Sequence, residues 1–166
     1  MCIRDRRGPA RHAAAWWAGC SALLLLALLS LQSAMAQAPR IGVATMQPGE
    51  VFFERFGHDA IVVVDPATQQ VTSYNFGFFD PGEPDFVPRF ARGEMMYYLV
   101  ALPLEEDLAQ YRDGGRGVSI QWLDLPPEQA QALADGLAVR SRPENARYHY
   151  DYFVANCATM VRDTLD

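Results

Sequence analysis

The stretch at residues 56–80, FGHDAIVVVDPATQQVTSYNFGFFD, decides the fold of this chain. Its first half contains a β-branched run at 61–64, after which Asp65 and Pro66 open a turn. Its second half returns at 71–79 with aromatic side chains. Two such runs on either side of a short polar turn predict an antiparallel hairpin.

Elements of both kinds surround this hairpin. Strands are expected at 40–46, 94–103 and 117–125, where apolar and β-branched residues predominate. Helices are expected at 104–115 and 126–141, with a further helix ending the chain and a short amphipathic piece at 86–92. The order is hairpin, strand, helix, strand, helix, helix. It predicts an α+β domain in which helices pack against an antiparallel sheet.

The start of the chain has the features of a cleaved secretory signal peptide. Arginines precede an apolar run at 23–31, and the small residues Ala34 and Ala36 follow it. The apolar run is short for a membrane span, which needs about 20 residues. We therefore expect residues 1–36 to be a leader and residues 37–166 to form a single exported domain. The first residues, MCIRDR, look like translated sequencing-adapter DNA, so the native start is expected further downstream.

Composition excludes several classes of function. The chain has no lysine and a formal net charge of −6, so it lacks the basic surface that nucleic acid requires. The histidines and cysteines do not have zinc-site spacing, and no glycine-rich phosphate cradle is present. We expect no cofactor and no nucleic-acid partner.

One cysteine remains when the leader is removed, because Cys2 and Cys20 lie within it. Cys157 follows Asn156, a favoured N-cap residue, so it is expected in the first turn of the last helix. Unpaired N–H groups and the helix dipole there favour the reactive thiolate. Exported proteins rarely keep a single thiol, which favours a chemical role. The alternative is a buried cysteine that acts as a small apolar residue.

A thiolate nucleophile usually needs a base, and the mature chain has two histidines. His58 begins the first hairpin strand, where Gly57 leaves backbone room for a helix end or a substrate. His149 lies in a tyrosine-rich run. The return strand is expected to pass His58 near Asn75, the polar side chain best placed to orient an imidazole. Alternatively, each histidine is structural, and Asn75 bonds its own backbone.

Two further clusters have simpler explanations. Residues 105–107 are acidic and open a predicted helix, where the helix dipole accounts for them without acid–base chemistry. Phe76, Phe78 and Phe79 could line a cleft for an acyl chain, but phenylalanines are more often core residues.

The segments FERFGHDAIVVV, SYNFGFFD and YHYDYFVANCATMVRD together resemble the Lnb N-terminal periplasmic domain family. The resemblance runs from about Pro48 to the last residue. That family is similar to the permuted NlpC-type, papain-like cysteine enzymes, which include lecithin:retinol acyltransferase. In those enzymes the histidine strand precedes the cysteine helix. The resemblance thus implies a permuted papain-like fold.

The resemblance also implies roles for individual residues. Cys157 corresponds to the nucleophile and His58 to the base, whereas Asn75 falls where relatives carry a polar orienting residue. His149 has no counterpart in the site. Members of the family continue beyond the cysteine helix, often into membrane-spanning segments, so this chain is expected to be a fragment or to lack that part.

Three functions are compatible with these residues. The resemblance implies a periplasmic acyltransferase that moves a lipid acyl chain through a cysteine thioester to the N-terminal amine of a lipoprotein, at the membrane surface. The alternatives are a cell-wall amidase or peptidase that uses the same pair, and a non-enzymatic envelope binding domain. A longer native chain would be membrane-associated.

Overall fold

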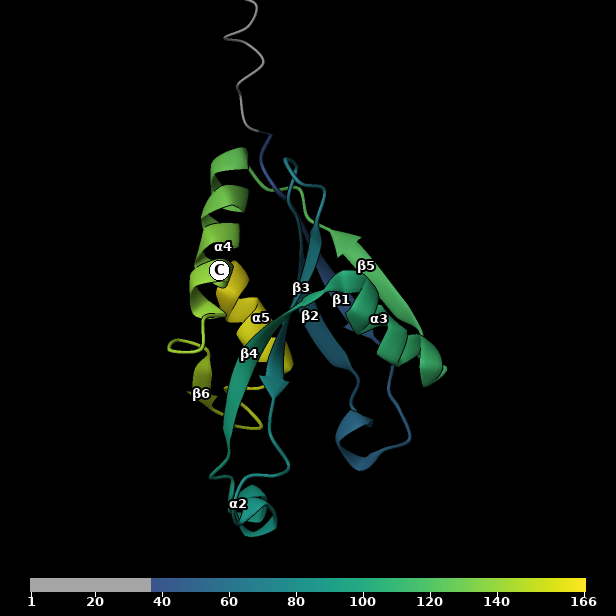
Figure 1. Ribbon diagram of the computed structural model, residues 1–166, viewed down its shortest axis with the longest axis vertical. Coiled ribbons are helices and arrows are strands. Elements are labelled where there is room, and N and C mark those ends of the chain that lie inside the picture. The colour runs from purple at the N-terminus through teal and green to yellow at the C-terminus, as the bar shows by residue number, and fades with distance from the viewer. Residues whose placement is uncertain (1–36) are drawn as a thin grey trace, which may run out of the picture. The chain divides into compact units, whose positions relative to one another are not determined.

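The computed structural model describes residues 37–166, which form an α+β domain (Figure 1). Its sheet has six strands in the order β5-β1-β2-β3-β4-β6, and every neighbouring pair is antiparallel. The strands are β1 (Arg40–Met46), β2 (His58–Val64), β3 (Val71–Phe78), β4 (Met96–Pro103), β5 (Val118–Trp122) and β6 (Arg147–His149). The predicted α+β class, with helices packed on an antiparallel sheet, is therefore confirmed, whereas the permuted papain-like relation stays a prediction. The predicted signal peptide lies outside the described residues.

Five helical segments complete the described part of the chain. They are the 3₁₀ turn η1 (Phe52–Glu54) and the helices α2 (Phe86–Arg92), α3 (Leu104–Asp113), α4 (Pro127–Arg140) and α5 (Cys157–Leu165). Pro127 stands at the start of α4, where its missing N–H leaves no helical hydrogen bond unmade. Within residues 37–166, no helix has both the length and the apolar character needed to cross a membrane.

The β2–β3 hairpin forms as its sequence predicts. Oδ1 of Asp65 accepts hydrogen bonds from the backbone N–H groups of Ala67 and Thr68, at 2.8 Å and 3.4 Å, which holds the turn. Across the hairpin, Ala60 pairs with Asn75. Because His58 is two residues before Ala60, this register brings the start of β2 close to Asn75.

The sheet is covered on both faces, with α4 and α5 on one side and α3 on the other (Figure 1). Ile61 and Phe76 pack with Val161 of α5 in the larger core. Ala60 and Val62 belong to a second cluster, against which Leu104 of α3 packs. Alternate residues of a strand point to opposite faces. The uninterrupted apolar run in β2 thus reflects burial on both faces.

The short strand β6 was not expected from the sequence. It pairs with β4, with Tyr148 opposite Tyr97, and extends the sheet beyond the hairpin. A three-residue strand is too short to show an alternating pattern, so only the assembled sheet identifies it. β6 then leads into the loop that delivers the chain to α5.

Candidate functional site

Cys157 is the first residue of α5, as predicted, and it is half-buried. Asn156 caps the helix: its Oδ1 accepts the N–H of Thr159 at 2.9 Å, and Thr159 Oγ1 accepts the N–H of Asn156 at 2.9 Å. Nδ2 of Asn156 also donates to the carbonyl of Tyr152 at 2.8 Å. This reciprocal capping fixes the helix start. It thereby fixes the direction in which the thiol points.

His58 is the first residue of β2, opposite Met46 on β1. Gly57 before it has φ +74°, and a Cβ at that position would lie 2.6 Å from the carbonyl oxygen of Met46. A glycine is required here because the backbone is left-handed and β1 approaches it closely. The room that Gly57 leaves is thus occupied by β1, and not by a helix end or a substrate as the sequence suggested.

The His58 ring is held by Asn75 of β3, whose Oδ1 lies 3.0 Å from Nε2 of His58. Nδ2 of Asn75 donates in turn to Ser73 Oγ and to Asp107 Oδ2, each at 3.0 Å. Ser73, Asn75 and Asp107 are all buried, with at most 3% of their surface exposed. Buried polar groups are stable when paired in this way. Through Asn75, this network orients the imidazole of His58.

Cys157 and His58 share a side-chain hydrogen bond and shift each other's ionisation. Burial is the largest effect on the pKa of Cys157 and raises it, but the hydrogen bond and charge of His58 and the backbone N–H of Asp59 lower it below the ordinary value. Burial likewise lowers the pKa of His58, but Cys157, Asn75 and Asp107 together raise it above the ordinary value. Both shifts favour a thiolate–imidazolium pair.

Asp107 is the site residue that sequence reasoning missed. The acidic run 105–107 does open α3, and Glu105 and Glu106 are exposed as expected of a helix start. Asp107, however, is buried and bonded to Asn75, so the helix dipole does not account for it. Nothing in the local sequence separates it from its two neighbours, because its burial depends on how α3 packs against β3.

The second histidine, and the sequence neighbours of Asn75 and His58, lie outside this network. His149 is exposed on β6, and its Nδ1 lies 3.2 Å from the carbonyl oxygen of Tyr150. Tyr74 belongs to the larger core. The carboxylate of Asp59 accepts a hydrogen bond from Thr45 Oγ1 at 2.9 Å, and only its backbone N–H reaches Cys157.

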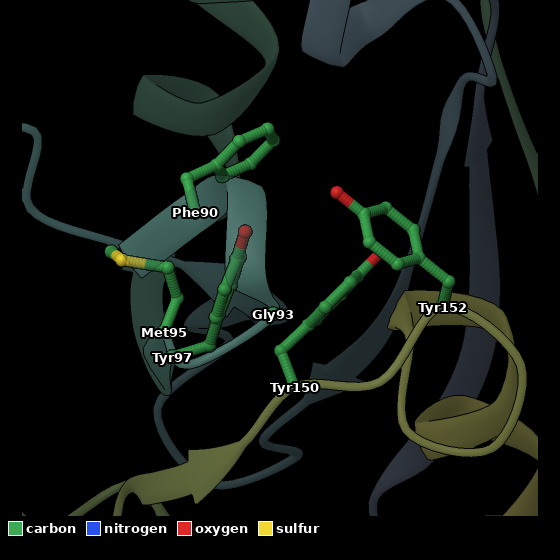
Figure 2. A pocket seen from close by; sticks show the side chains of 6 residues that line it. All are labelled: Phe90, Gly93, Met95, Tyr97, Tyr150 and Tyr152. Atoms are coloured by element: carbon green, nitrogen blue, oxygen red, sulfur yellow. The ribbon is translucent and has the colours of Figure 1, made fainter. Parts of the chain in front are cut away.

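A small aromatic pocket lies beside the loop that leads to Cys157 (Figure 2). Figure 2 shows Tyr150 between Tyr97, which stacks on it at 4.2 Å, and Tyr152, which meets it edge-on at 5.3 Å. Phe90, Gly93 and Met95 complete the lining. Its cavity volume is about 10 Å³, about the room of one water molecule and far below the roughly 300–1,000 Å³ of pockets that enclose a ligand. The aromatic pocket is therefore too small to enclose a ligand.

Phe76, Phe78 and Phe79 have different surroundings, and Phe76 is a core residue, the assignment that the sequence favoured over an acyl-chain cleft. Phe76 is fully buried, with its ring edge-on to that of Tyr148 at 6.1 Å. Phe79 packs between Phe86 and Tyr97, at centroid distances of 5.6 Å and 5.3 Å. These rings support the sheet and the walls of the aromatic pocket instead.

The charge of Cys157 contributes to the raised pKa values of three tyrosines. Burial, together with that charge and other neighbouring charges, raises the pKa values of Tyr111 and Tyr150 to about 12. Burial and then Cys157 raise the pKa of Tyr148 as well. The Tyr148 hydroxyl is buried and has no hydrogen-bond partner within the described chain.

Exposed apolar side chains occur in three segments that either adjoin the site residues in sequence or lie next to the aromatic pocket. Phe56 is 91% exposed and precedes His58 by two residues, and Phe153, 86% exposed, precedes Cys157 by four. The ring of Phe52 lies 6.5 Å from that of Phe90, which joins η1 to α2 and the aromatic pocket. We call the exposed apolar residues of these segments the apolar rim: Val51, Phe52, Phe56, Val87, Tyr152, Phe153 and Val154. η1, α2 and the loop before α5 lie toward the lower end of the domain in Figure 1.

Among residues 37–166, no three histidine, cysteine, aspartate or glutamate side chains are grouped so that they could hold a metal ion. The candidate site consists of protein side chains. It is a cysteine and a histidine in a polar network within an α+β domain.

A comparison with protein families identifies the family to which this chain belongs. Residues 31–166 match the family described as the Lnb N-terminal periplasmic domain. The chain belongs to that family, which indicates a periplasmic location. No curated protein and no solved structure gave a significant match.

Proposed function

We propose that this domain is a cysteine-dependent acyltransferase that moves an acyl chain from a lipid ester to an amine. The observation that carries the proposal is the continuous network from Cys157 through His58 to Asn75. A nucleophile paired with a base, and a base oriented by a third group, is the arrangement that covalent catalysis requires. The match to the Lnb N-terminal periplasmic domain family supports the same assignment.

In the first step, the Cys157 thiolate attacks the carbonyl carbon of the ester. A C–S bond forms, the C–O bond breaks, and the imidazolium of His58 gives its proton to the departing alkoxide. The negative charge that develops on the carbonyl oxygen lies at the start of α5. The first N–H groups of a helix lack intrahelical acceptors and stabilise such an anion.

In the second step, an amine attacks the thioester. A C–N bond forms, the C–S bond breaks, and neutral His58 takes the proton that the amine loses. Cys157 leaves as a thiolate, so the resting pair is restored. The resemblance to the Lnb N-terminal periplasmic domain family implies the N-terminal amine of a lipoprotein as the acceptor.

The apolar rim favours a lipid donor over a cell-wall peptide. Exposed Phe56 and Phe153 flank the two reacting residues closely in the sequence. Clusters of exposed apolar residues are uncommon on soluble surfaces and mark interaction sites. At a bilayer, aromatic side chains of this kind enter the interfacial region. The rim would bring Cys157 to the level of lipid ester groups, and the acyl chain need not be enclosed by the small aromatic pocket.

The test is to trap and transfer the acyl group. The chain is incubated with vesicles of a phospholipid carrying a labelled acyl chain, and intact mass spectrometry follows the adduct on Cys157. The expected result is a hydroxylamine-sensitive thioester that disappears when a peptide with a free N-terminal amine is added, as the label appears on that peptide. Free labelled fatty acid without labelled peptide would indicate hydrolysis instead.

Matched variants show whether the reaction belongs to this site. Cys157→Ser and His58→Ala should abolish labelling, whereas His149→Ala should leave it unchanged because His149 is exposed and outside the network. Labelling that survives Cys157→Ser would exclude the mechanism. Absence of any adduct in the unmodified chain with lipid or peptide esters would favour a binding domain.

A further inference from the structure

The buried carboxylate of Asp107 is linked to the reacting pair through Asn75. It lies on a different element from either residue of the pair. It is on α3, only 3% of its surface is exposed, and its Oδ2 accepts a hydrogen bond from Nδ2 of Asn75 at 3.0 Å. Burial of a charged group is costly unless it is bonded. A carboxylate kept at such a place therefore suggests a task beyond packing.

The role of Asp107 follows from which groups around the Asn75 amide can donate hydrogen bonds and which can only accept them. The amide of Asn75 has one acceptor, Oδ1, and one donor group, Nδ2, and it has two possible orientations. A carboxylate only accepts hydrogen bonds, so Nδ2 must face Asp107 and Oδ1 must face His58. Ser73 could not impose this choice, because a hydroxyl both donates and accepts.

The orientation of Asn75 sets the state of the imidazole. Oδ1 accepts only, so Nε2 of His58 must carry a hydrogen. In the neutral ring, Nδ1 is then the nitrogen without a hydrogen, and it is the one left to pair with Cys157. With Asn75 reversed, the neutral ring would carry its hydrogen on Nδ1 and could not accept a proton from a nucleophile on that side.

We propose that Asp107 is a positioning residue: its fixed acceptor character orients the Asn75 amide and thereby selects the tautomer of His58 that faces Cys157. The catalytic meaning of this inference rests on the proposed function, but the tautomer is a property of the folded chain alone. The negative charge of Asp107 acts in the same direction, because it favours the imidazolium.

Other ionisable groups face the same pair. The carboxylate of Asp59 opposes the thiolate from β2. The titratable or charged groups in electrostatic contact with Asp107 or Cys157 are His58, Tyr111, Tyr148 and Tyr150, and Arg116 and Glu54 act on Tyr111 in turn. Asp107 differs from all of these in being bonded to the residue that orients His58.

The first experiment measures the tautomer in the unmodified chain. Nitrogen-15 NMR of His58, recorded above its titration midpoint where the ring is neutral, should show the hydrogen on Nε2. A neutral ring with its hydrogen on Nδ1 would overturn the proposal. This readout needs no substrate, and it does not depend on whether a variant folds.

The second experiment replaces the carboxylate by its neutral isostere. Alkylation of Cys157 by iodoacetamide is followed across pH in the full chain, with peptide mass spectrometry to separate it from Cys2 and Cys20. Asp107→Asn should lower the rate at pH 7 about 10-fold, equivalent to a one-unit rise in the thiol pKa. The matched control Glu106→Gln makes the same change at an exposed carboxylate of α3 outside the network and should keep the original pH midpoint.

The outcomes separate this inference from the proposed function. A pH profile of Asp107→Asn that superimposes on that of the unmodified chain would overturn it. An equal shift in Glu106→Gln would also overturn it, because the loss of any nearby negative charge would then suffice. A chain with the expected tautomer and profile that transfers no acyl group would disprove the function and leave the role of Asp107 intact.

Discussion

The imidazole of His58 interacts with two residues: Nε2 lies 3.0 Å from Oδ1 of Asn75, and the ring and Cys157 shift each other's pKa. These residues come from β2, β3 and the start of α5. The sheet therefore supplies the base and its orienting group, and the capped helix supplies the nucleophile. Each shifts the ionisation of the other, which leads directly to the first prediction.

Cys157 should react as a thiolate below the pH range of an ordinary thiol. Its pKa is lowered and that of His58 is raised, so the ion pair exists between the two values and the thiolate is lost only when pH falls below the thiol pKa. His58→Ala removes the positive partner, and the alkylation rate at pH 7 should fall at least about 10-fold. His149→Ala is the control. A pH profile unchanged by His58→Ala would contradict the pairing.

Asn75→Ala should damage both stability and reactivity. It leaves the buried carboxylate of Asp107 without its hydrogen bond, which costs about 1–3 kcal/mol in the free energy of unfolding. It also frees the imidazole of His58, and loss of the group that fixes the tautomer of a catalytic histidine can cost up to about 10⁴-fold in activity. Denaturant unfolding and thioester formation measure the two effects. Activity within twofold of the unmodified chain would show that the imidazole needs no support from β3.

Gly57→Ala tests the backbone that delivers His58. Its φ of +74° costs a residue with a Cβ about 1–2 kcal/mol, and the added Cβ would meet the carbonyl oxygen of Met46. Gly93 has a similar φ of +70° and nothing within 4 Å of a built Cβ, so Gly93→Ala isolates the conformational cost. Gly57→Ala should lower the unfolding midpoint more than Gly93→Ala. Equal losses would mean that β1 yields to the methyl group.

The hydroxyl of Tyr148 gives a prediction of the opposite sign. It is buried without a partner in the described residues, whereas the ring packs on Phe76. Removal of an unsatisfied buried polar group relieves a desolvation penalty, so Tyr148→Phe should leave the unfolding free energy unchanged or raise it by about 1 kcal/mol. A loss of stability above 1 kcal/mol would show that the hydroxyl has a partner in the native protein.

Local sequence was sufficient to predict the fold class and part of the candidate site. The β-branched run before Asp65 and the aromatic run after it were sufficient to place Asn75 beside the start of β2, since register follows from the turn. Asn156 likewise indicated a helix start at Cys157 because capping chemistry is local. The catalytic roles of Cys157, His58 and Asn75 stay predictions, although their side chains are joined in one network.

What local sequence could not supply depends on packing between distant elements. Asp107 follows two other acidic residues on α3, and only the docking of that helix on β3 selects it for burial. Phe76, Phe78 and Phe79 lie close together in sequence, but the register of β3 against β4 shifts between Asn75 and Phe78, and their rings have different surroundings. The strand β6 exists only because β4 offers it an edge.

The apolar rim gives the last prediction. Phe56→Asp and Phe153→Asp place charges on side chains that are 91% and 86% exposed, so the unfolding midpoint should hardly change. If the rim enters the bilayer interface, both variants should lose binding to neutral phospholipid vesicles, because burial of a phenylalanine contributes roughly 1.5–3 kcal/mol. Sedimentation with vesicles measures binding, and light scattering shows whether the variants have changed oligomeric state.

A control at an exposed apolar residue outside the rim separates the loss of membrane contact from the general effect of a charge on the surface. Val139 lies on α4, 46% exposed and outside the rim, so Val139→Asp should bind vesicles as the unmodified chain does. The rim variants should keep normal iodoacetamide reactivity at Cys157, because neither side chain belongs to the polar network. Their acyl transfer should then fall with lipid in vesicles but persist with a short-chain, soluble ester. Equal losses on both substrates would place Phe56 and Phe153 in the reacting site itself, and not on a membrane-contacting surface.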